Sequence, residues 1–171
     1  EHADTFGSLI QPNETILPLL KPVAEVPEAR HTYLGQMVST VLAQAEQLSQ
    51  RYAVVVANPP YMGSKQMNAL LSQFMKDEYP EVKQDLYGAF VVRGIELAHR
   101  AGLLAIVIGD TWMSIKSFED LRLRLLDGHS FDSFVHMRDV SNHPDIFGAN
   151  AAFVLSMAGD RQRHAPFIRL T

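Results

Sequence analysis

Apolar residues recur at three- and four-residue spacing between residues 32 and 50, and this spacing predicts an amphipathic helix. The apolar positions of this helix are Leu34, Met37, Val38, Val41, Leu42, Ala45 and Leu48. Residues 1–31 differ, because four prolines there separate short apolar pairs. Since proline interrupts helices, we expect residues 1–31 to form an extended connection and residues 32–171 to form the folded core.

Two uninterrupted apolar runs, Tyr52–Ala57 and Leu103–Gly109, are typical of strands buried on both faces of a parallel sheet. Between them the apolar spacing predicts helices over Gln66–Glu78 and Asp85–Arg100, the second of which ends at Gly102. A strand, a pair of helices and a second strand form a crossover unit, which is expected to be parallel and right-handed.

The last third of the sequence predicts one helix and two short strands. The helix begins with Ser117 as its cap and ends at Gly128, and the strands cover residues 131–137 and 151–158. Together with the crossover unit, these elements place the chain in the α/β class.

The tetrapeptide Asn58-Pro59-Pro60-Tyr61 directly follows the first predicted strand. Open α/β sheets bind their ligands just outside the carboxyl ends of their strands. Two consecutive prolines fix the backbone and remove two N–H donors, which leaves their carbonyl groups and the Asn58 side chain as acceptors. This position and this composition make residues 58–61 the candidate catalytic site.

Methylation of an exocyclic amine is one reaction that such a site supports. The nitrogen lone pair of adenine is delocalised into the ring, so its hydrogens must be held out of plane before the nitrogen can attack. The Asn58 side-chain oxygen and the Pro59 carbonyl can each accept one of these hydrogens, while Tyr61 stacks on the base. Positioning and electrostatics then carry the step without a strong base.

The motifs resemble those of the gamma-type adenine-N6 DNA methyltransferases, and most closely those of the PglX methyltransferases of BREX phage-defence systems. The similar segments, in family order, are Val54–Gly63, Asp85–Tyr87, Gly102–Met113, Phe147 and Ala151–Met157. The resemblance implies an S-adenosylmethionine-dependent enzyme of phage defence or restriction-modification. Its fold would be the C-terminal half of a Rossmann-like methyltransferase sheet, with the first strands missing.

The resemblance also implies roles for individual residues. Asn58, Pro59, Pro60 and Tyr61 are the catalytic residues, and Tyr61 and Phe147 pack on an adenine that has been flipped out of the duplex. Asp4 approaches the adenine of S-adenosylmethionine, and Asn58 is the second cofactor-binding residue. Lys65, just after the tetrapeptide, is a candidate contact to DNA.

Composition limits what the chain can do alone. Hydrophobic residues make up 47% and charged residues 20% of the 171 residues, which is typical of a globular protein. The absence of cysteine excludes disulfides and thiolate metal sites and agrees with a reducing bacterial cytoplasm. A net charge of −4 is not that of a self-sufficient nucleic-acid binder, so we expect double-stranded DNA to be bound through a longer protein.

We therefore interpret residues 1–171 as a partial catalytic domain, since the chain starts at Glu1 and lacks the family's glycine-containing cofactor loop and DNA-recognition region. The isolated chain is expected to be inactive, and its first strand, deprived of a neighbour, is expected to promote self-association. No apolar run is long enough to span a bilayer.

Other functions stay open on the sequence alone. Protein-glutamine and RNA-base N-methyltransferases use the same tetrapeptide, because their substrates also present a planar, conjugated nitrogen. A non-catalytic, methyltransferase-like binding module is a further alternative. The seven histidines lack metal-ligand spacing, so no metal site is predicted. Arg122, Arg124 and Arg138 are interpreted as solvated charges and not as DNA contacts.

Overall fold

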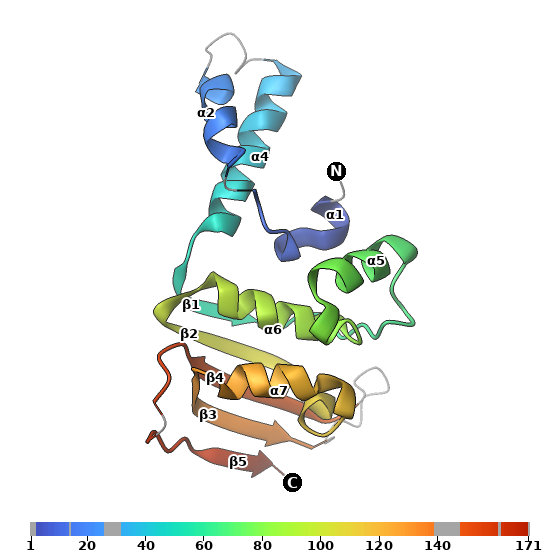
Figure 1. The fold of residues 1–171 in the computed structure, drawn as a ribbon, viewed down its shortest axis with the longest axis vertical. Coiled ribbons are helices and arrows are strands. Elements are labelled where there is room, and N and C mark those ends of the chain that lie inside the picture. Colours follow the sequence, from blue (N-terminus) through green and yellow to red (C-terminus); the bar gives the residue numbers. More distant parts are fainter. Residues whose placement is uncertain (1–2, 14, 26–31, 139–147, 161, 171) are drawn as a thin grey trace. The chain divides into compact units, whose positions relative to one another are not determined.

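The computed structural model describes residues 3–13, 15–25, 32–138, 148–160 and 162–170. The chain divides into two compact units, Glu1–Arg51 and Tyr52–Thr171 (Figure 1). The helix that we expected at the start of the α/β core is therefore part of the first unit.

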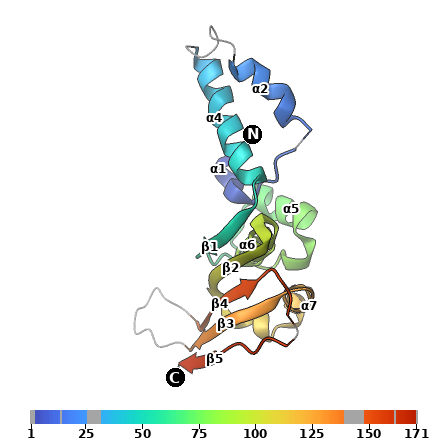
Figure 2. The same cartoon turned by 90° about the vertical axis from the view of Figure 1, so that its left-hand side faces the viewer.

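The first unit is helical. Its elements are α1 (Ala3–Phe6), η1 (Gly7–Leu9), α2 (Leu17–Glu25) and α4 (Tyr33–Ser49). The helices α2 and α4 lie side by side (Figures 1 and 2), and Lys21 Nζ of α2 lies 2.8 Å from Glu46 Oε1 of α4. Thr32 Oγ1 accepts a hydrogen bond of 3.1 Å from the Gly35 N–H group, so α4 begins where the sequence predicted.

The expectation of an extended connection over residues 1–31 is wrong for α2. Pro18 is the second residue of α2, where a helix does not need the missing N–H group. Pro22 lies inside the helix and removes one backbone hydrogen bond. Packing of α2 against α4 offsets this loss, which periodicity alone does not reveal.

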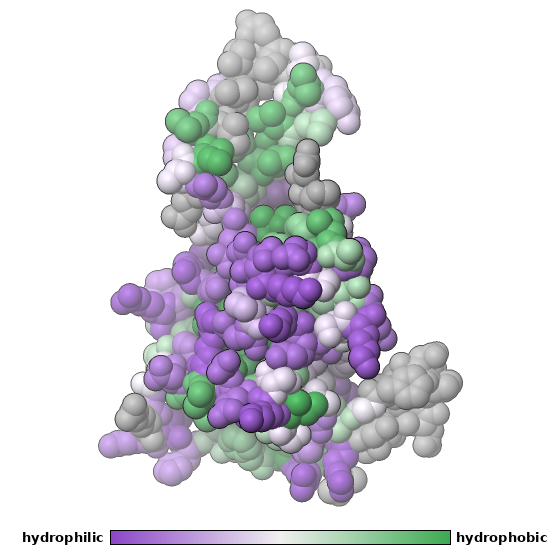
Figure 3. All heavy atoms as spheres, turned by 45° about the vertical axis from the view of Figure 1, so that its right-hand side comes forward, coloured by the Kyte–Doolittle hydropathy of each residue, from purple (hydrophilic) through white to green (hydrophobic). Residues whose placement is uncertain are grey.

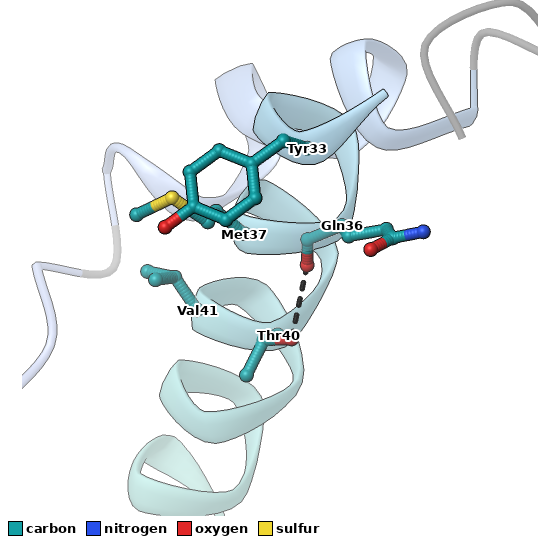
Figure 4. A pocket seen from close by; sticks show the side chains of 5 residues that line it. All are labelled: Tyr33, Gln36, Met37, Thr40 and Val41. Atoms are coloured by element: carbon teal, nitrogen blue, oxygen red, sulfur yellow. Dashed lines mark hydrogen bonds between the residues drawn. The ribbon is translucent and has the colours of Figure 1, made fainter. Parts of the chain in front are cut away.

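The outward side of α4 carries a shallow pocket of about 330 Å³ (Figure 4). Its walls are Tyr33, Gln36, Met37, Thr40 and Val41. The Thr40 hydroxyl donates a hydrogen bond of 2.9 Å to the Gln36 carbonyl, so this hydroxyl has a partner within the helix.

The second unit is built on a five-stranded sheet with the order β1-β2-β4-β3-β5. The strands are β1 (Tyr52–Ala57), β2 (Ala98–Gly109), β3 (Ser130–Met137), β4 (Asn150–Ser156) and β5 (Phe167–Leu170). The strands β1 and β2 are parallel, as the crossover unit predicted, and Val54 pairs with Leu103. The strand β4 is antiparallel to both β2 and β3, so β1, β2 and β3 all end at the same edge. The short strand β5, parallel to β3, was not predicted.

Helices of the second unit lie on one face of this sheet (Figures 1 and 2). The helical elements are α5 (Ala69–Glu78), η2 (Pro80–Val82), α6 (Leu86–Leu97), η3 (Asp110–Met113), η4 (Lys116–Phe118) and α7 (Glu119–Leu126). On the covered face β2 buries Leu104, Ile106 and Ile108. Figure 3 shows mainly hydrophilic residues on the outside of this helical layer.

Three predicted helix boundaries are wrong. Gly102 does not close α6, which ends at Leu97, but lies within β2. A Cβ atom at Gly102 would lie 2.9 Å from the carbonyl oxygens of Tyr52 and Ala53, so close strand pairing explains the glycine. Ser117 does not cap α7, because it lies inside η4. The helix α5 begins at Ala69, capped by the Asn68 side chain, and not at Gln66.

The opposite face of the sheet is open. Val54 and Val56 of β1 remain 56% and 75% exposed, and β1 forms the edge of the sheet. A shallow groove of about 190 Å³ runs over this face, lined among others by Val107, Val135 and Val154. The prediction that β1 is buried on both faces is therefore wrong for this chain. Among the residues that the structure describes, β1 pairs with β2 alone.

Candidate active site at the carboxyl end of β1

The candidate tetrapeptide begins where β1 ends. Asn58 and Pro60 are exposed, Pro59 is buried, and Tyr61 is 43% exposed. Burial of Pro59 fixes the backbone between the exposed amide and the exposed ring. The Asn58 side chain and one part of the Tyr61 ring are thus accessible to a ligand.

Backbone pairing ties the loop after Tyr61 to the start of α6. The Leu86 N–H group donates to the Met62 carbonyl at 3.0 Å, and the Ser64 N–H group donates to the Gln84 carbonyl at 2.8 Å. Gly63 and Asp85 form an isolated antiparallel bridge between these two pairs. The tetrapeptide is therefore held at both ends, by β1 before it and by this bridge after it.

Asp85 adds a side-chain link to the same loop. One of its carboxylate oxygens, Oδ1, accepts hydrogen bonds of 3.2 Å from both the Met62 and the Tyr87 N–H groups. Burial raises the pKa of Asp85 above its ordinary value, and the backbone hydrogen bonds oppose this shift. Asp85 thus caps α6 and anchors the site loop with one oxygen atom.

A row of aromatic rings lies behind Tyr61. The Tyr61 ring meets Tyr87 edge to face, with 6.1 Å between centroids, and Tyr87 stacks on Phe118 at 5.5 Å. The Tyr87 hydroxyl lies 2.7 Å from Thr111 Oγ1, next to the end of β2. Burial raises the pKa of Tyr61, and it raises that of Tyr87 to about 12. Both hydroxyl groups are therefore neutral at physiological pH.

Sequence reasoning missed a polar cluster at the same edge of the sheet. Asp110 Oδ2 lies 2.9 Å from His136 Nε2, and Arg169 Nε donates to His136 Nδ1 at 3.4 Å. The Asp110 N–H group donates to the Ala149 carbonyl at 3.0 Å. Asp110 directly follows an apolar strand, which was the available signal, but the partner on β3 is visible only once the strand order is known.

The other predicted site residues lie in different places. Lys65 is exposed in the turn after the tetrapeptide. Asp4 is exposed in the first unit, at a pocket of about 710 Å³ that also includes Ile10, Ile16 and Leu48. Phe147 lies outside the described residues.

Two of the arginines have partners within the protein. Arg122 Nη1 donates to the carbonyls of Trp112 and Ile115 at 2.6 and 2.8 Å, and Arg124 pairs with Glu81. Both side chains are thus bound within the protein, and the absence of a role for them in DNA binding stays a prediction.

The part of the chain that the structure describes contains neither a candidate metal cluster nor a candidate membrane-spanning helix. No group of three histidine or carboxylate residues there could hold a metal ion. Among the same residues, no helix combines the length and the apolar character that crossing a membrane requires.

The sequence profile of the Eco57I restriction-modification methylases matches residues 24–143, and the chain belongs to this family. In fold it is similar to a structure from Listeria monocytogenes assigned to the class I S-adenosylmethionine-dependent methyltransferases. That likeness has a TM-score of 0.53 at 10% identity and covers 80% of this chain and 45% of that one. The architecture is thus part of a Rossmann-like methyltransferase fold, as predicted.

Two curated relatives that the chain resembles in sequence are adenine-specific methyltransferases. The chain is 37% identical over 142 residues to the adenine-specific methyltransferase BrxX of Escherichia coli O9:H4 (strain HS), covering 79% of this chain and 12% of that protein. It is 40% identical over 78 residues to the adenine-specific methyltransferase PglX of Lacticaseibacillus casei (strain Zhang), covering 46% of this chain and 6% of that protein. The predicted resemblance to PglX-type enzymes is confirmed. The chain spans only a small part of the length of these relatives.

Proposed function

We propose that this chain is the part of an S-adenosylmethionine-dependent DNA methyltransferase that methylates the N6 amine of adenine, in phage defence or restriction-modification. The observation that carries the proposal is the exposed Asn58 amide beside the half-exposed Tyr61 ring, at the carboxyl end of a strand. Membership of a restriction-modification methylase family and similarity to two adenine-specific enzymes support it.

In the proposed mechanism, Asn58 Oδ1 and the Pro59 carbonyl each accept one hydrogen of the adenine amine. These bonds draw the nitrogen lone pair out of conjugation and stabilise the positive charge that develops on N6. Tyr61 holds the ring of the flipped base by stacking. When bound, S-adenosylmethionine would supply the electrophilic methyl group, and the proton that the methylated N6 gives up would leave to solvent.

For the cofactor, we propose Asp4 and Asn58 as contacting residues. The pocket at Asp4 combines a carboxylate acceptor with apolar walls, which suits a purine ring that carries an amine. We propose that residues 1–171 alone hold the cofactor too weakly for turnover, since only part of the relatives' length is represented.

For DNA, we propose Lys65 as a phosphate contact and Phe147 as a second ring against the flipped adenine. Lys65 is exposed in the turn that follows Tyr61, so its ammonium group is available for a contact to a backbone phosphate. The chain's charge of −4 implies that other parts of the full-length protein supply most of the attraction to double-stranded DNA.

The proposal is tested with Asn58→Ala in the full-length protein that contains this segment. The variant is expected to transfer labelled methyl groups to adenine-containing DNA at a rate that is lower by about 100-fold or more. A loss of this size is typical when one charge-stabilising group is removed from an active site. Its melting temperature should stay close to that of the wild type, because Asn58 is exposed. Unchanged activity would remove Asn58 from the mechanism.

The same assay separates the alternatives. Glutamine-containing peptides and RNA are offered beside adenine-containing DNA, because each presents a planar nitrogen to the same acceptors. Labelling of the peptide or the RNA alone would overturn the assignment to DNA, and labelling of none would favour a non-catalytic binding module.

A further inference from the structure

We propose that Asp85 and Tyr87 are positioning residues that set the place and tilt of Tyr61 as a platform for the target base. This inference rests on the proposed function, because it concerns the same base. Neither residue is required to touch the substrate. Asp85 acts through the loop after Tyr61, and Tyr87 acts through the Tyr61 ring.

The contacts of Asp85 make it a link between two elements that are far apart in sequence. Its Oδ1 atom receives the N–H groups of Met62 and Tyr87, both at 3.2 Å. An ordinary helix cap would need only the second of these bonds. The first bond fixes the residue next to Tyr61 to the start of α6, so movement of the loop has to break a charge-assisted hydrogen bond.

Tyr87 provides the surface on which Tyr61 rests. Tyr87 is only 2% exposed, and its ring is held between the edge contact to Tyr61 and the stack on Phe118. The hydroxyl bond of 2.7 Å to Thr111 fixes its far end beside β2. The contact with Tyr87 covers only part of Tyr61, and 43% of the Tyr61 surface remains exposed to a ligand.

The arrangement matters because catalysis here depends on position. The acceptors on Asn58 and Pro59 are fixed by the end of β1, whereas the base reaches them only in the plane that Tyr61 sets. A displacement of about 1 Å at such a contact can lower a rate by about 100-fold without changing the reacting groups. Loss of the Asp85 link should therefore slow the chemical step more than it weakens DNA binding.

The experiment uses substitutions at Asp85 that separate its two hydrogen bonds. Asp85→Ser keeps a helix-capping hydroxyl but is too short to reach Met62, and Asp85→Asn keeps an acceptor for both N–H groups. Asn68→Ala is the matched control, because the Asn68 side chain caps a different helix, α5, by accepting a hydrogen bond of 2.8 Å from the Leu71 N–H group. Thr111→Val removes one of the two hydrogen-bond partners of the Tyr87 hydroxyl, the other being the Trp112 backbone, and it does so at an exposed position that does not endanger folding.

Each variant of the full-length protein is measured in three ways. These are the single-turnover methylation rate, the Kd for DNA, and the fluorescence lifetimes of 2-aminopurine placed at the target position. The fluorescence of a flipped 2-aminopurine that stacks on Tyr61 is quenched. The fluorescence of an unstacked 2-aminopurine has a long lifetime. Lifetimes of the bound complex report on the platform, and a merely structural role would leave them unchanged.

We expect Asp85→Ser to lower the single-turnover rate by about 10- to 100-fold. Its Kd for DNA should change by less than about threefold, since few contacts to the duplex are lost, and its long-lifetime fraction should rise. Thr111→Val should do the same to a smaller extent, and Asp85→Asn and Asn68→Ala should resemble the wild type.

Wild-type lifetimes and rates in both Asp85→Ser and Thr111→Val would overturn the inference, and so would an equal effect of Asn68→Ala. A wild-type protein that methylates no adenine would instead overturn the proposed function. Should Asp85→Ser fail to fold, Thr111→Val decides the matter by its lifetimes alone.

Discussion

Asn58 and Tyr61 are exposed just after the end of β1, and the Asp85 carboxylate holds the loop that follows them. The exposure of Asn58 and Tyr61 follows from their place after an apolar strand, and it was predicted. The link from Asp85 to Met62 was not, because it joins residues 23 positions apart through one carboxylate oxygen. A sequence indicates that Asp85 begins a helix, but not which second donor its side chain meets.

Tyr87 leads to a prediction on pH at the same scale. Burial, and to a smaller extent the charges of Asp85 and Asp110, raise its pKa from 10.0 to about 12, against the Thr111 hydrogen bond. In the unfolded chain Tyr87 ionises near 10.0, so it favours the folded state fully below that pH. This contribution is lost as the pH rises toward 12.

Tyrosinate absorbance and denaturant unfolding measured across this range test the prediction. We expect Tyr87→Phe to remove one tyrosine ionisation near pH 12 and to flatten the alkaline decline in the free energy of unfolding. A Tyr87→Phe protein with the same alkaline titration as the wild type would contradict the raised pKa.

Among whole elements, those with a strong apolar period were predicted well and those fixed by tertiary contacts were not. The helix α4 and the strand β1 match the prediction because their own residues carry the pattern. The proline-containing helix α2 depends on packing against α4, and the short strand β5 depends on pairing with β3. Neither contact leaves a periodic signal in the sequence.

A substitution at Gly102 tests whether the close approach of β1 and β2 requires glycine. Alanine there would place its Cβ atom 2.9 Å from three backbone oxygens, so β1 and β2 would have to move apart. We expect Gly102→Ala to lower the free energy of unfolding by about 2 kcal/mol or more.

Gly109→Ala, at the end of the same strand, is the matched control, because the nearest atom to its Cβ would lie at 3.6 Å. Chemical denaturation of both variants checks the prediction. Equal stability of the two would show that the close approach of the strands does not determine the choice of glycine.

For the chain as a whole, the unpaired edge of β1 and the open apolar face beside it have a consequence for solution behaviour. Unpaired strand edges pair with other chains, and apolar surface favours association. We expect residues 1–171 to self-associate with rising concentration in sedimentation velocity runs. A monomer at all concentrations would refute this.

Val56→Lys should reduce the association, because it places a charge on the edge strand at a position that is 75% exposed. Leu126→Lys adds the same charge at an exposed position of α7, on the covered side of the sheet, and should leave the association unchanged. An equal loss in both variants would indicate that net charge, and not the β1 edge, governs the assembly.

The pairing of Met137 with Asn150 has a consequence for insertions between β3 and β4. It fixes the two attachment points of the intervening residues beside the edge that holds Asn58, independently of what lies between them. Lengthening a loop between fixed ends costs only about 0.6 kcal/mol for each doubling. The register of β3 and β4 therefore depends little on the length of the segment that joins Met137 to Asn150.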